Sequence, residues 1–262
     1  MNSSSPLSIV YVWDADYPWD VRTQKVCLAL AAAGHRVTIV ARNRAWLPES
    51  EALPEGTVRR MPAWRWAGQR ADGILGFPAF FSPRWSRLIR HAVRDAAADL
   101  IIVRDIPLCP TAIAVGRRLR VPVMLDMAEN YPAMMRVLWE TERHTSLDYL
   151  VRNPRATALV ERLCVRAVDH IVVVVEESAE RVRALGVPES KLTIVSNTPP
   201  RDRVEETPAR RARAGNRIDV AYMGNIEVAR GLLEAVDAIA HLNASGCPAR
   251  LRIIGRGRDR DF

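Results

Sequence analysis

The hydrophobic positions along the chain alternate between two periodicities. Short runs of consecutive apolar residues, typical of buried parallel strands, are separated by segments whose apolar residues recur every three or four positions, as on one face of a helix. The strand-like runs are residues 7–12, 36–41, 58–61, 100–103, 122–126, 170–175 and 192–195. The helix-like segments are residues 21–33, 83–97, 111–119, 155–168 and 176–185, with a loop rich in Trp, Pro and Gly before residue 83. This alternation predicts an α/β domain with a doubly wound parallel sheet.

The chain changes character after residue 198. Residues 199–216 are rich in Pro, Arg and Glu and poor in large apolar residues, which indicates an exposed linker. A strand-like run at 218–223, a cationic turn, a helical pattern at 232–242 and a second strand near 251–254 then predict a right-handed βαβ unit. We therefore expect a first domain over residues 1–198. A stable sheet normally needs three or more strands, so residues 217–262 predict an incomplete second domain.

Composition limits where such a chain works. Of its 262 residues 48% are hydrophobic, enough for a sizeable core, yet no run of about 18 uncharged apolar residues exists. The first six residues are polar, unlike the start of a signal peptide, so we expect a cytoplasmic protein. Its four cysteines are scattered without a C-x-x-C pair, which predicts buried or inert thiols.

The net charge of +8 comes almost entirely from arginine and favours partners that carry phosphates or an anionic surface. Nucleic acid is not expected as a partner, because the basic residues are spread over many segments without a zinc-ligand, basic-zipper or RNP-like pattern.

Aromatic residues and arginines are interleaved over residues 64–94. On a helix that starts near Pro83, the arginines fall largely on one side and Trp85, Ile89 and Val93 share another. A basic amphipathic helix of this kind docks on anionic lipid at the inner membrane face, or else packs its apolar side into the core and leaves its arginines in solvent. The pattern leaves both hypotheses open.

Three long segments follow one another in the order and spacing of a known family. They are YPWDVRTQKVCLALAAAGHRVTIVAR from residue 17, RDIPLCPTAIAVGRRLRVPVMLDMAENYP from residue 104 and VERLCVRAVDHIVVVVEESAERVRALGVPESKLTIVSNTPP from residue 160. Together with the βαβ pattern at 218–257 they resemble the glycosyltransferases of family 4. The resemblance implies the GT-B fold, in which a Rossmann-like acceptor-side domain faces a second Rossmann-like domain that binds a nucleotide sugar.

The resemblance assigns donor binding to the turn after residue 223. Its residues are Gly224, Asn225, Arg230 and Gly231, where the family usually places an Arg and a Lys near the donor diphosphate. Arg230 keeps a positive charge that suits a phosphate, whereas Asn225 offers only a hydrogen bond.

The resemblance also assigns an acceptor side. Asp126 and Glu129 match an Asp-x-His-Glu motif whose histidine is replaced by Ala128, and they are the expected catalytic residues. Asp16, Asp20 and Arg22 lie in the expected acceptor-side loop. Strand carboxyl ends point into the ligand crevice of open α/β sheets, which suits these positions. We expect neither a catalytic metal nor a cofactor besides the donor substrate, and the missing glycine-rich turn after the first strand argues against NAD or FAD.

The expected function is transfer of a sugar from a nucleotide-sugar donor to a glycan or lipid-linked acceptor, with retention, in polysaccharide biosynthesis. The family's donor-side Glu-x7-Glu segment has no counterpart here, so the resemblance implies a truncated chain that is inactive alone. Two alternatives stay open because one fold serves several functions. They are a non-catalytic truncated GT-B protein that acts as a binding partner, and a fragment of a sugar-nucleotide 2-epimerase.

Overall fold

The structure is a computed structural model that describes residues 5–77, 80–141, 153–198, 216–227 and 230–257. The chain divides into two compact units, Met1–Thr198 and Pro199–Phe262. The predicted linker, apart from residue 216, lies outside the described residues, and the predicted domain boundaries stay predictions. Each unit is described by itself.

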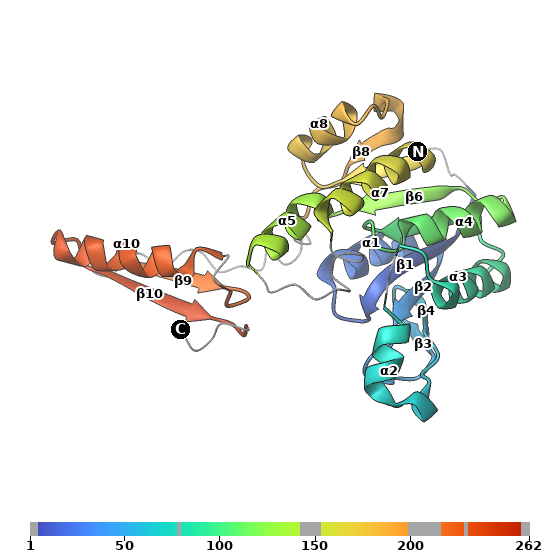
Figure 1. Cartoon of the computed structure of the whole chain (residues 1–262), viewed down its shortest axis with the longest axis horizontal. Coiled ribbons are helices and arrows are strands. Elements are labelled where there is room, and N and C mark those ends of the chain that lie inside the picture. Colours follow the sequence, from blue (N-terminus) through green and yellow to red (C-terminus); the bar gives the residue numbers. More distant parts are fainter. Residues whose placement is uncertain (1–4, 78–79, 142–152, 199–215, 228–229, 258–262) are drawn as a thin grey trace. The chain divides into compact units, whose positions relative to one another are not determined.

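An eight-stranded sheet forms the centre of the first unit, with the strand order β3-β4-β2-β1-β5-β6-β7-β8 (Figure 1). The strands are β1 (Ser8–Asp16), β2 (Arg36–Arg42), β3 (Ser50–Leu53), β4 (Gly56–Arg60), β5 (Leu100–Arg104), β6 (Val123–Met127), β7 (His170–Val173) and β8 (Leu192–Ile194). All neighbouring strands are parallel except β3 and β4, which pair antiparallel at the edge. The predicted parallel α/β architecture is therefore confirmed.

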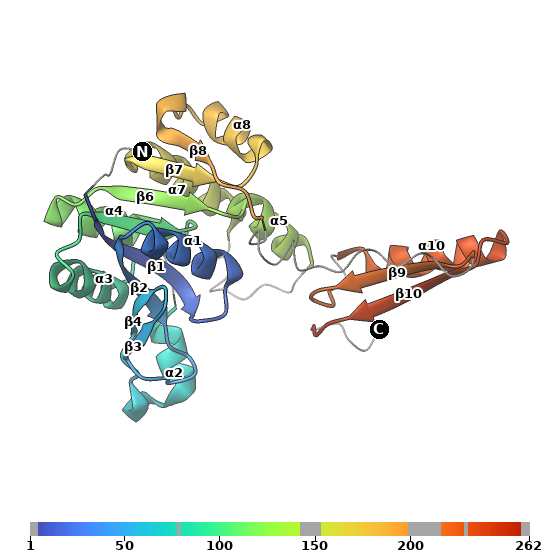
Figure 2. The ribbon, with the colours of Figure 1, turned by 180° about the vertical axis from the view of Figure 1, so that it is seen from behind.

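Helices cover both faces of this sheet. The helices of the first unit are α1 (Val21–Ala32), α2 (Gly68–Leu75), α3 (Pro83–Asp95), α4 (Cys109–Leu119), α5 (Tyr131–Thr141), α7 (Pro154–Ala167) and α8 (Glu176–Ala184), with short 3-10 turns η1 (Arg65–Ala67) and η2 (Glu189–Lys191). Figures 1 and 2 show α1 on one face and α3, α4 and α7 on the other. The chain thus winds in opposite directions from β1, which pairs with β2 on one side and with β5 on the other.

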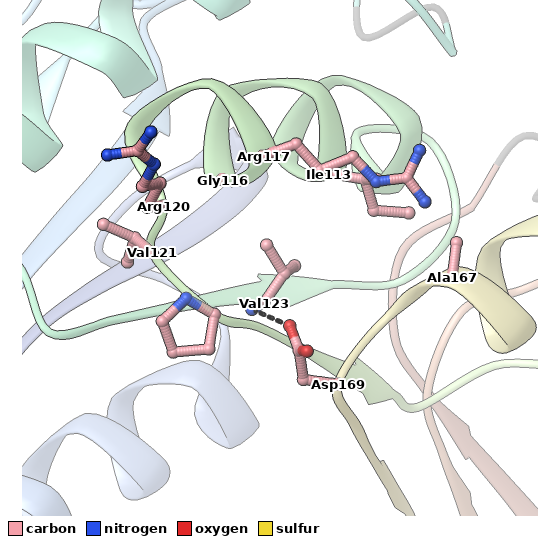
Figure 3. A pocket seen from close by; sticks show the side chains of 9 residues that line it. Ile113, Gly116, Arg117, Arg120, Val121, Val123, Ala167 and Asp169 are labelled. Carbon is pink, nitrogen blue, oxygen red and sulfur yellow. Dashed lines mark hydrogen bonds between the residues drawn. The ribbon is translucent and has the colours of Figure 1, made fainter.

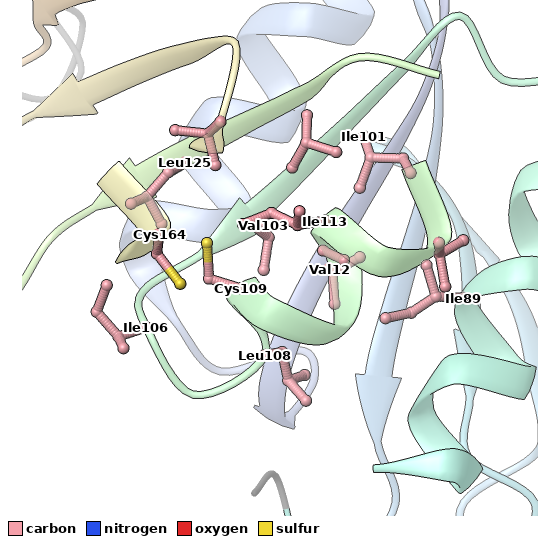
Figure 4. Packing of buried hydrophobic residues seen from close by; sticks show 14 of the residues in the cluster. Val12, Ile89, Ile101, Val103, Ile106, Leu108, Cys109, Ile113, Leu125 and Cys164 are labelled. Atoms are coloured by element: carbon pink, nitrogen blue, oxygen red, sulfur yellow. The ribbon is translucent and has the colours of Figure 1, made fainter. Parts of the chain in front are cut away.

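The core follows the two-residue period of the strands. Val10 and Val12 belong to a buried cluster under α3, α4, α7 and α8, whereas Ile9 and Tyr11 belong to the cluster under α1. Figure 4 shows the larger cluster, in which side chains of β5 and β6 pack against those of α4 and α7. The apolar side of α3 also enters this core, since Trp85 and Ile89 are fully buried. That side of α3 is consequently not free to dock on lipid.

Several elements differ from the sequence-based expectation. The first strand runs to Asp16 rather than ending at residue 12, so Asp16 lies in the strand and not in a loop. The expected loop before residue 83 contains η1 and α2, and neither β3 nor α5 is expected from the periodicity. These elements are short or carry weak patterns, and contacts distant in sequence hold some of them in place. For example, Asp72 of α2 accepts hydrogen bonds from Trp46 and Arg84.

The second unit contains β9 (Ile218–Met223), α10 (Leu232–Ala244) and β10 (Ala249–Ile254). The two strands pair in parallel, so the predicted βαβ unit is confirmed. Just beyond β9 and β10 the two backbone segments stay in contact. A Cβ atom on Gly255 would lie 1.8 Å from the carbonyl oxygen of Gly224, and one on Gly257 would lie 1.8 Å from that of Ile226. Only glycine permits this close approach of the two backbones.

Candidate functional site

The carboxyl ends of β1, β5 and β6 lie side by side in the sheet, because β5 pairs with both neighbours. The chain reverses its winding direction between β1 and β5, and open α/β sheets bind ligands at such a switch point. The structure brings most of the predicted acceptor-side residues to this edge, on β1, at the start of α1 and at the end of β6. It is the candidate site of the first unit.

Asp126 lies at this edge in a buried ion pair with Arg22. Their side chains are only 4% exposed, and the guanidinium Nη2 of Arg22 lies 2.5 Å from Oδ1 of Asp126. The hydroxyl of Tyr11 donates to Oδ2 at 2.6 Å, and burial followed by the charge of Asp126 raises the pKa of Tyr11 well above its ordinary value. Nη1 of Arg22 donates to the carbonyl of Val195 and to Oδ1 of Asn197. Both oxygens of Asp126 are therefore occupied by protein donors, and its catalytic role stays a prediction.

Arg104 is a second buried cation at the same edge, and it was not expected from the sequence. Its Nη1 donates to the carboxylate of Asp20 and, at 2.9 Å, to the hydroxyl of Thr23, while the guanidinium lies 4.3 Å from the ring centroid of Trp13. Asp20 also caps α1, because its Oδ1 accepts the backbone N–H of Thr23 at 2.7 Å. The predicted acceptor-side residue Asp20 thus fixes both the helix start and Arg104.

Asp105 follows Arg104 and is 2% exposed. Its Oδ1 accepts the backbone N–H groups of Ala128 at 2.8 Å and Glu129 at 3.1 Å, and its own backbone has φ 57°. Burial raises the pKa of Asp105 to about 7. Its position just beyond a strand carboxyl end is visible in the sequence, but its burial depends on the folded chain. Burial also raises the pKa of the half-buried Asp14, on β1, to about 6.

Glu129 and Asp16 are the more accessible carboxylates of the predicted set. Glu129 is exposed, and its backbone is held by Asp105. Asp16 accepts two hydrogen bonds from Arg44, one from the backbone N–H and one from Nε, both at 2.8 Å. Asp126, Asp20 and Asp16 are therefore paired with arginines, whereas the side chain of Glu129 is open to solvent.

The predicted donor-binding residues lie between the end of β9 and the start of α10 in the second unit. Gly231 precedes the helix with φ 70°, and as a glycine it provides no side-chain cap for the first turn. Arg230 is 57% exposed, and its Nε lies 3.8 Å from a carboxylate oxygen of Glu227. The exposed Asn225 offers its carbonyl to the hydroxyl of Tyr222 at 2.6 Å. Uncapped N–H groups, the helix dipole and a neighbouring arginine together make an arrangement suited to a phosphate.

A pocket of about 310 Å³ lies at the opposite edge of the first sheet, beside the amino ends of β6 and β7 (Figure 3). There the backbone N–H of Val123 donates to Asp169 at 2.8 Å. The lining residues are Ile113, Gly116, Arg117, Arg120, Val121, Pro122, Val123, Ala167 and Asp169. None of the predicted site residues lines it, so it is separate from the candidate site.

The profile of the glycosyl transferase 4-like domain matches residues 20–198, which is more than half of the chain. The chain therefore belongs to the glycosyl transferase 4-like family and is a protein of the glycosyltransferase class. The match covers every acceptor-side residue described above except those of β1. No curated protein matches the sequence.

Solved structures show the same fold. The chain resembles sucrose-phosphate synthase from Thermosynechococcus elongatus with a TM-score of 0.65 at 15% identity, over 98% of this chain and 64% of that chain. It resembles the trehalose-6-phosphate protein of E. coli bound with UDP-2-fluoro glucose with a TM-score of 0.58 at 12% identity, over 97% and 66% of the two chains. It also resembles the catalytic domain of starch synthase IV from Arabidopsis thaliana, bound to ADP and acarbose. The TM-score is 0.56 at 11% identity, over 97% of this chain and 69% of that chain.

The predicted GT-B type of fold is thereby confirmed, and the chain spans about 64% of the length of the synthase. No helix in the described ranges is long and apolar enough to cross a bilayer. Among the described residues no three His, Cys, Asp or Glu side chains are grouped to hold a metal ion. The expectations about metal, cofactor and compartment stay predictions.

Proposed function

We propose that the chain is part of a retaining glycosyltransferase that moves a sugar from a nucleotide-sugar donor to a glycan or lipid-linked acceptor, in polysaccharide synthesis. The family match and the GT-B fold support the reaction class. Two similar structures support a nucleotide-sugar donor, because one is bound to ADP and the other to UDP-2-fluoro glucose.

The observation that carries the proposal is the start of α10. Gly231 leaves the first-turn N–H groups without a side-chain cap, and the exposed guanidinium of Arg230 adjoins them. A cation at a helix amino terminus is repelled by the positive end of the helix dipole. An anion that binds both the cation and the first-turn N–H groups removes this repulsion. A donor diphosphate has the charge and the acceptor oxygens for this place, and electrostatic stabilisation of the departing diphosphate is the main catalytic requirement of sugar transfer.

On the acceptor side the proposal separates the two predicted catalytic residues. Glu129 is exposed at the carboxyl edge of the sheet, and it would bind an acceptor hydroxyl directly. Asp126 would act as a positioning residue, because its oxygens are held by Tyr11 and Arg22. In this proposal Asp20 holds the loop before α1 in place through its bonds to Arg104 and Thr23.

Binding of UDP and ADP sugars to the chain tests the donor site by calorimetry. Arg230→Ala removes a charge-assisted hydrogen bond to phosphate, so affinity should fall by about 10- to 100-fold. Arg250→Ala is the matched control. Arg250 has a similarly exposed side chain, but it pairs with Asp219 at the amino ends of the strands, at 2.9 Å. Equal losses in the two variants would contradict the proposed donor site.

Product analysis of a longer protein that contains this chain separates the proposed function from its alternatives. A glycan product whose anomeric configuration matches that of the donor, seen by NMR, supports retaining transfer. Conversion of the nucleotide sugar into its 2-epimer without an acceptor would indicate an epimerase. Neither donor binding nor turnover would favour a non-catalytic binding partner.

A further inference from the structure

Five large apolar side chains are exposed on the segment between β4 and α3. Single exposed apolar residues are normal on protein surfaces, whereas contiguous exposed apolar surface marks an interaction site. Here the rings of Trp64 and Trp66 stack, and five exposed apolar residues fall within one segment. We call these residues the aromatic patch: Trp64 (36% exposed), Trp66 (83%), Ile74 (73%), Phe77 (39%) and Phe81 (62%). The segment that carries it, with α2, lies beside β3 and β4 at one end of the first unit (Figures 1 and 2).

The patch is held by a fixed frame rather than by loose ends. Asp72 of α2 is 6% exposed and accepts hydrogen bonds from the indole of Trp46, the backbone N–H of Trp64 and the guanidinium of Arg84. The indole of the buried Trp85 donates to the carbonyl of Gly76 at 3.2 Å. The rings of Trp64 and Trp66 stack with their centroids 5.9 Å apart. The exposed side chains are therefore presented by a framework tied to the core.

Positive charge accompanies the aromatic residues. Residues 64–94 contain six arginines and one acidic residue, Asp72, which is paired with Arg84. Guanidinium groups lie over the rings of Trp64, Trp46 and Phe77, and Arg65 and Arg87 are exposed. Protruding Trp, Ile and Phe side chains on an arginine-rich segment fit an occupant with an apolar interior and an anionic surface.

We propose that the aromatic patch docks on an anionic phospholipid bilayer, with Trp66, Ile74 and Phe81 entering the interface while neighbouring arginines bind lipid phosphates. Tryptophan is favoured at the headgroup level of bilayers, and each nearby arginine is attracted by an anionic leaflet. The binding surface is the exposed segment before α3, because the apolar side of α3 itself is buried in the core. The proposal does not depend on the sugar-transfer reaction.

Vesicle co-flotation of the whole chain tests this proposal with phosphatidylcholine vesicles and with equal mixtures of phosphatidylcholine and phosphatidylglycerol. The wild type should float with the mixed vesicles at about 0.1 M salt and lose binding at high salt, since screening weakens the charge attraction. The variant Trp66→Ser/Ile74→Ser/Phe81→Ser should bind at least about tenfold more weakly. Leu159→Ser/Leu163→Ser is the matched control, because both leucines are 59% exposed on α7, outside the patch. It should bind like the wild type.

Three outcomes of the flotation and light-scattering experiments would overturn the proposal. They are undiminished flotation of the patch variant, equal loss in the α7 control, and a dimer of the free chain that the patch variant dissociates in light scattering. Quenching of wild-type tryptophan fluorescence by brominated lipid needs no variant, and the absence of quenching in mixed vesicles would also contradict insertion. The patch variant should keep the wild-type unfolding temperature, because its replaced side chains are exposed; if it does not, the quenching result decides.

Discussion

The carboxylate of Asp126 is shared by donors from two different elements. Tyr11 of β1 and Arg22 of α1 both bind it, and Arg22 also binds the carbonyl of Val195 beyond β8. Removing two charges from water costs several kcal/mol, which their attraction offsets only while the pairing is complete. The pair and its partners therefore join β1, α1, β6 and the segment beyond β8 at the edge that carries the candidate site.

Replacing Asp126 by Asn should destabilise the first unit by about 3 kcal/mol or more, because Arg22 keeps a buried charge without a carboxylate. All seven tryptophans lie before residue 198, so urea unfolding followed by tryptophan fluorescence reports on this unit. Asp16→Asn is the control, since Asp16 pairs with Arg44, whose side chain is 54% exposed. Asp16→Asn should lower the free energy of unfolding by less than about 1 kcal/mol. Equal costs for the two variants would contradict a special role for the buried pair.

Asp105 should make the first unit less stable as pH rises. Its pKa is raised by burial to about 7, whereas an unfolded aspartate ionises near 3.9. Between about pH 4 and pH 7 the folded chain binds the additional proton, so the free energy of unfolding falls as pH increases. The difference of about three pKa units corresponds to at most about 4 kcal/mol.

Asp105→Asn keeps the acceptor oxygen for Ala128 and Glu129, and Asn tolerates a positive φ. This variant should gain stability relative to the wild type as pH rises from 5 to 8. Unfolding in urea at several pH values measures the difference. Asp14→Asn serves as the comparison, because Asp14 contributes in the same direction with a pKa of about 6. A constant difference between Asp105→Asn and the wild type over this range would contradict the assignment.

At the scale of elements, the sequence predicts those strands and helices whose own residues carry the periodicity. Strands such as β5 are runs of apolar residues, and α1 has a capping residue, Asp20, before it and Gly34 after it. The edge strand β3, SEAL, has no buried residue, and α2 includes Gly68 and Gly73. Such elements depend on pairing with β4 or on the bonds of Asp72, which local patterns do not contain.

The same limit applies to the candidate site. Topology predicts that Asp126, Asp20 and Glu129 come to one edge, because carboxyl ends of parallel strands meet there. The partner of Asp126, however, is 104 residues away in sequence, and Arg104 binds a residue 84 positions earlier. These pairings depend on side-chain directions in the folded sheet. The sequence therefore identifies the edge but not which of its carboxylates are paired with arginines.

The packing of α4 against β6 depends on Gly116. A Cβ atom at this position would lie 2.4 Å from a methyl of Val123 and 2.7 Å from the carbonyl oxygen of Val121. Gly116→Ala should therefore destabilise the first unit by about 1–3 kcal/mol, despite the better helix propensity of alanine. Ala114→Gly, at an exposed position of the same helix, measures the propensity difference of about 1 kcal/mol. If Gly116→Ala stabilises the protein by that amount, the contact is not as tight as described.

At the scale of the whole molecule, the two units differ in how much apolar surface they bury. Among the described residues, the buried apolar side chains of the second unit are Leu232 and Ala249, whereas the first unit has two extended clusters. Large apolar residues of β9 and β10 such as Val220, Met223 and Ile254 are exposed. Since burial is the dominant stabilising term, the two units should open with very different free energies.

Hydrogen exchange followed by mass spectrometry measures this difference on the intact chain. Peptides that contain β9, α10 and β10 should exchange at least about a hundredfold faster than those of β1 and β5, because their strands open without unfolding a core. A peptide that contains α8 is the internal control, since it lies at the edge of the first sheet yet buries Ala179 and Val182. If β9 were protected as strongly as β1, the second unit would draw stability from contacts other than its own.

Saturating nucleotide sugar should slow exchange at the start of α10, because a ligand that binds the folded unit raises its opening free energy.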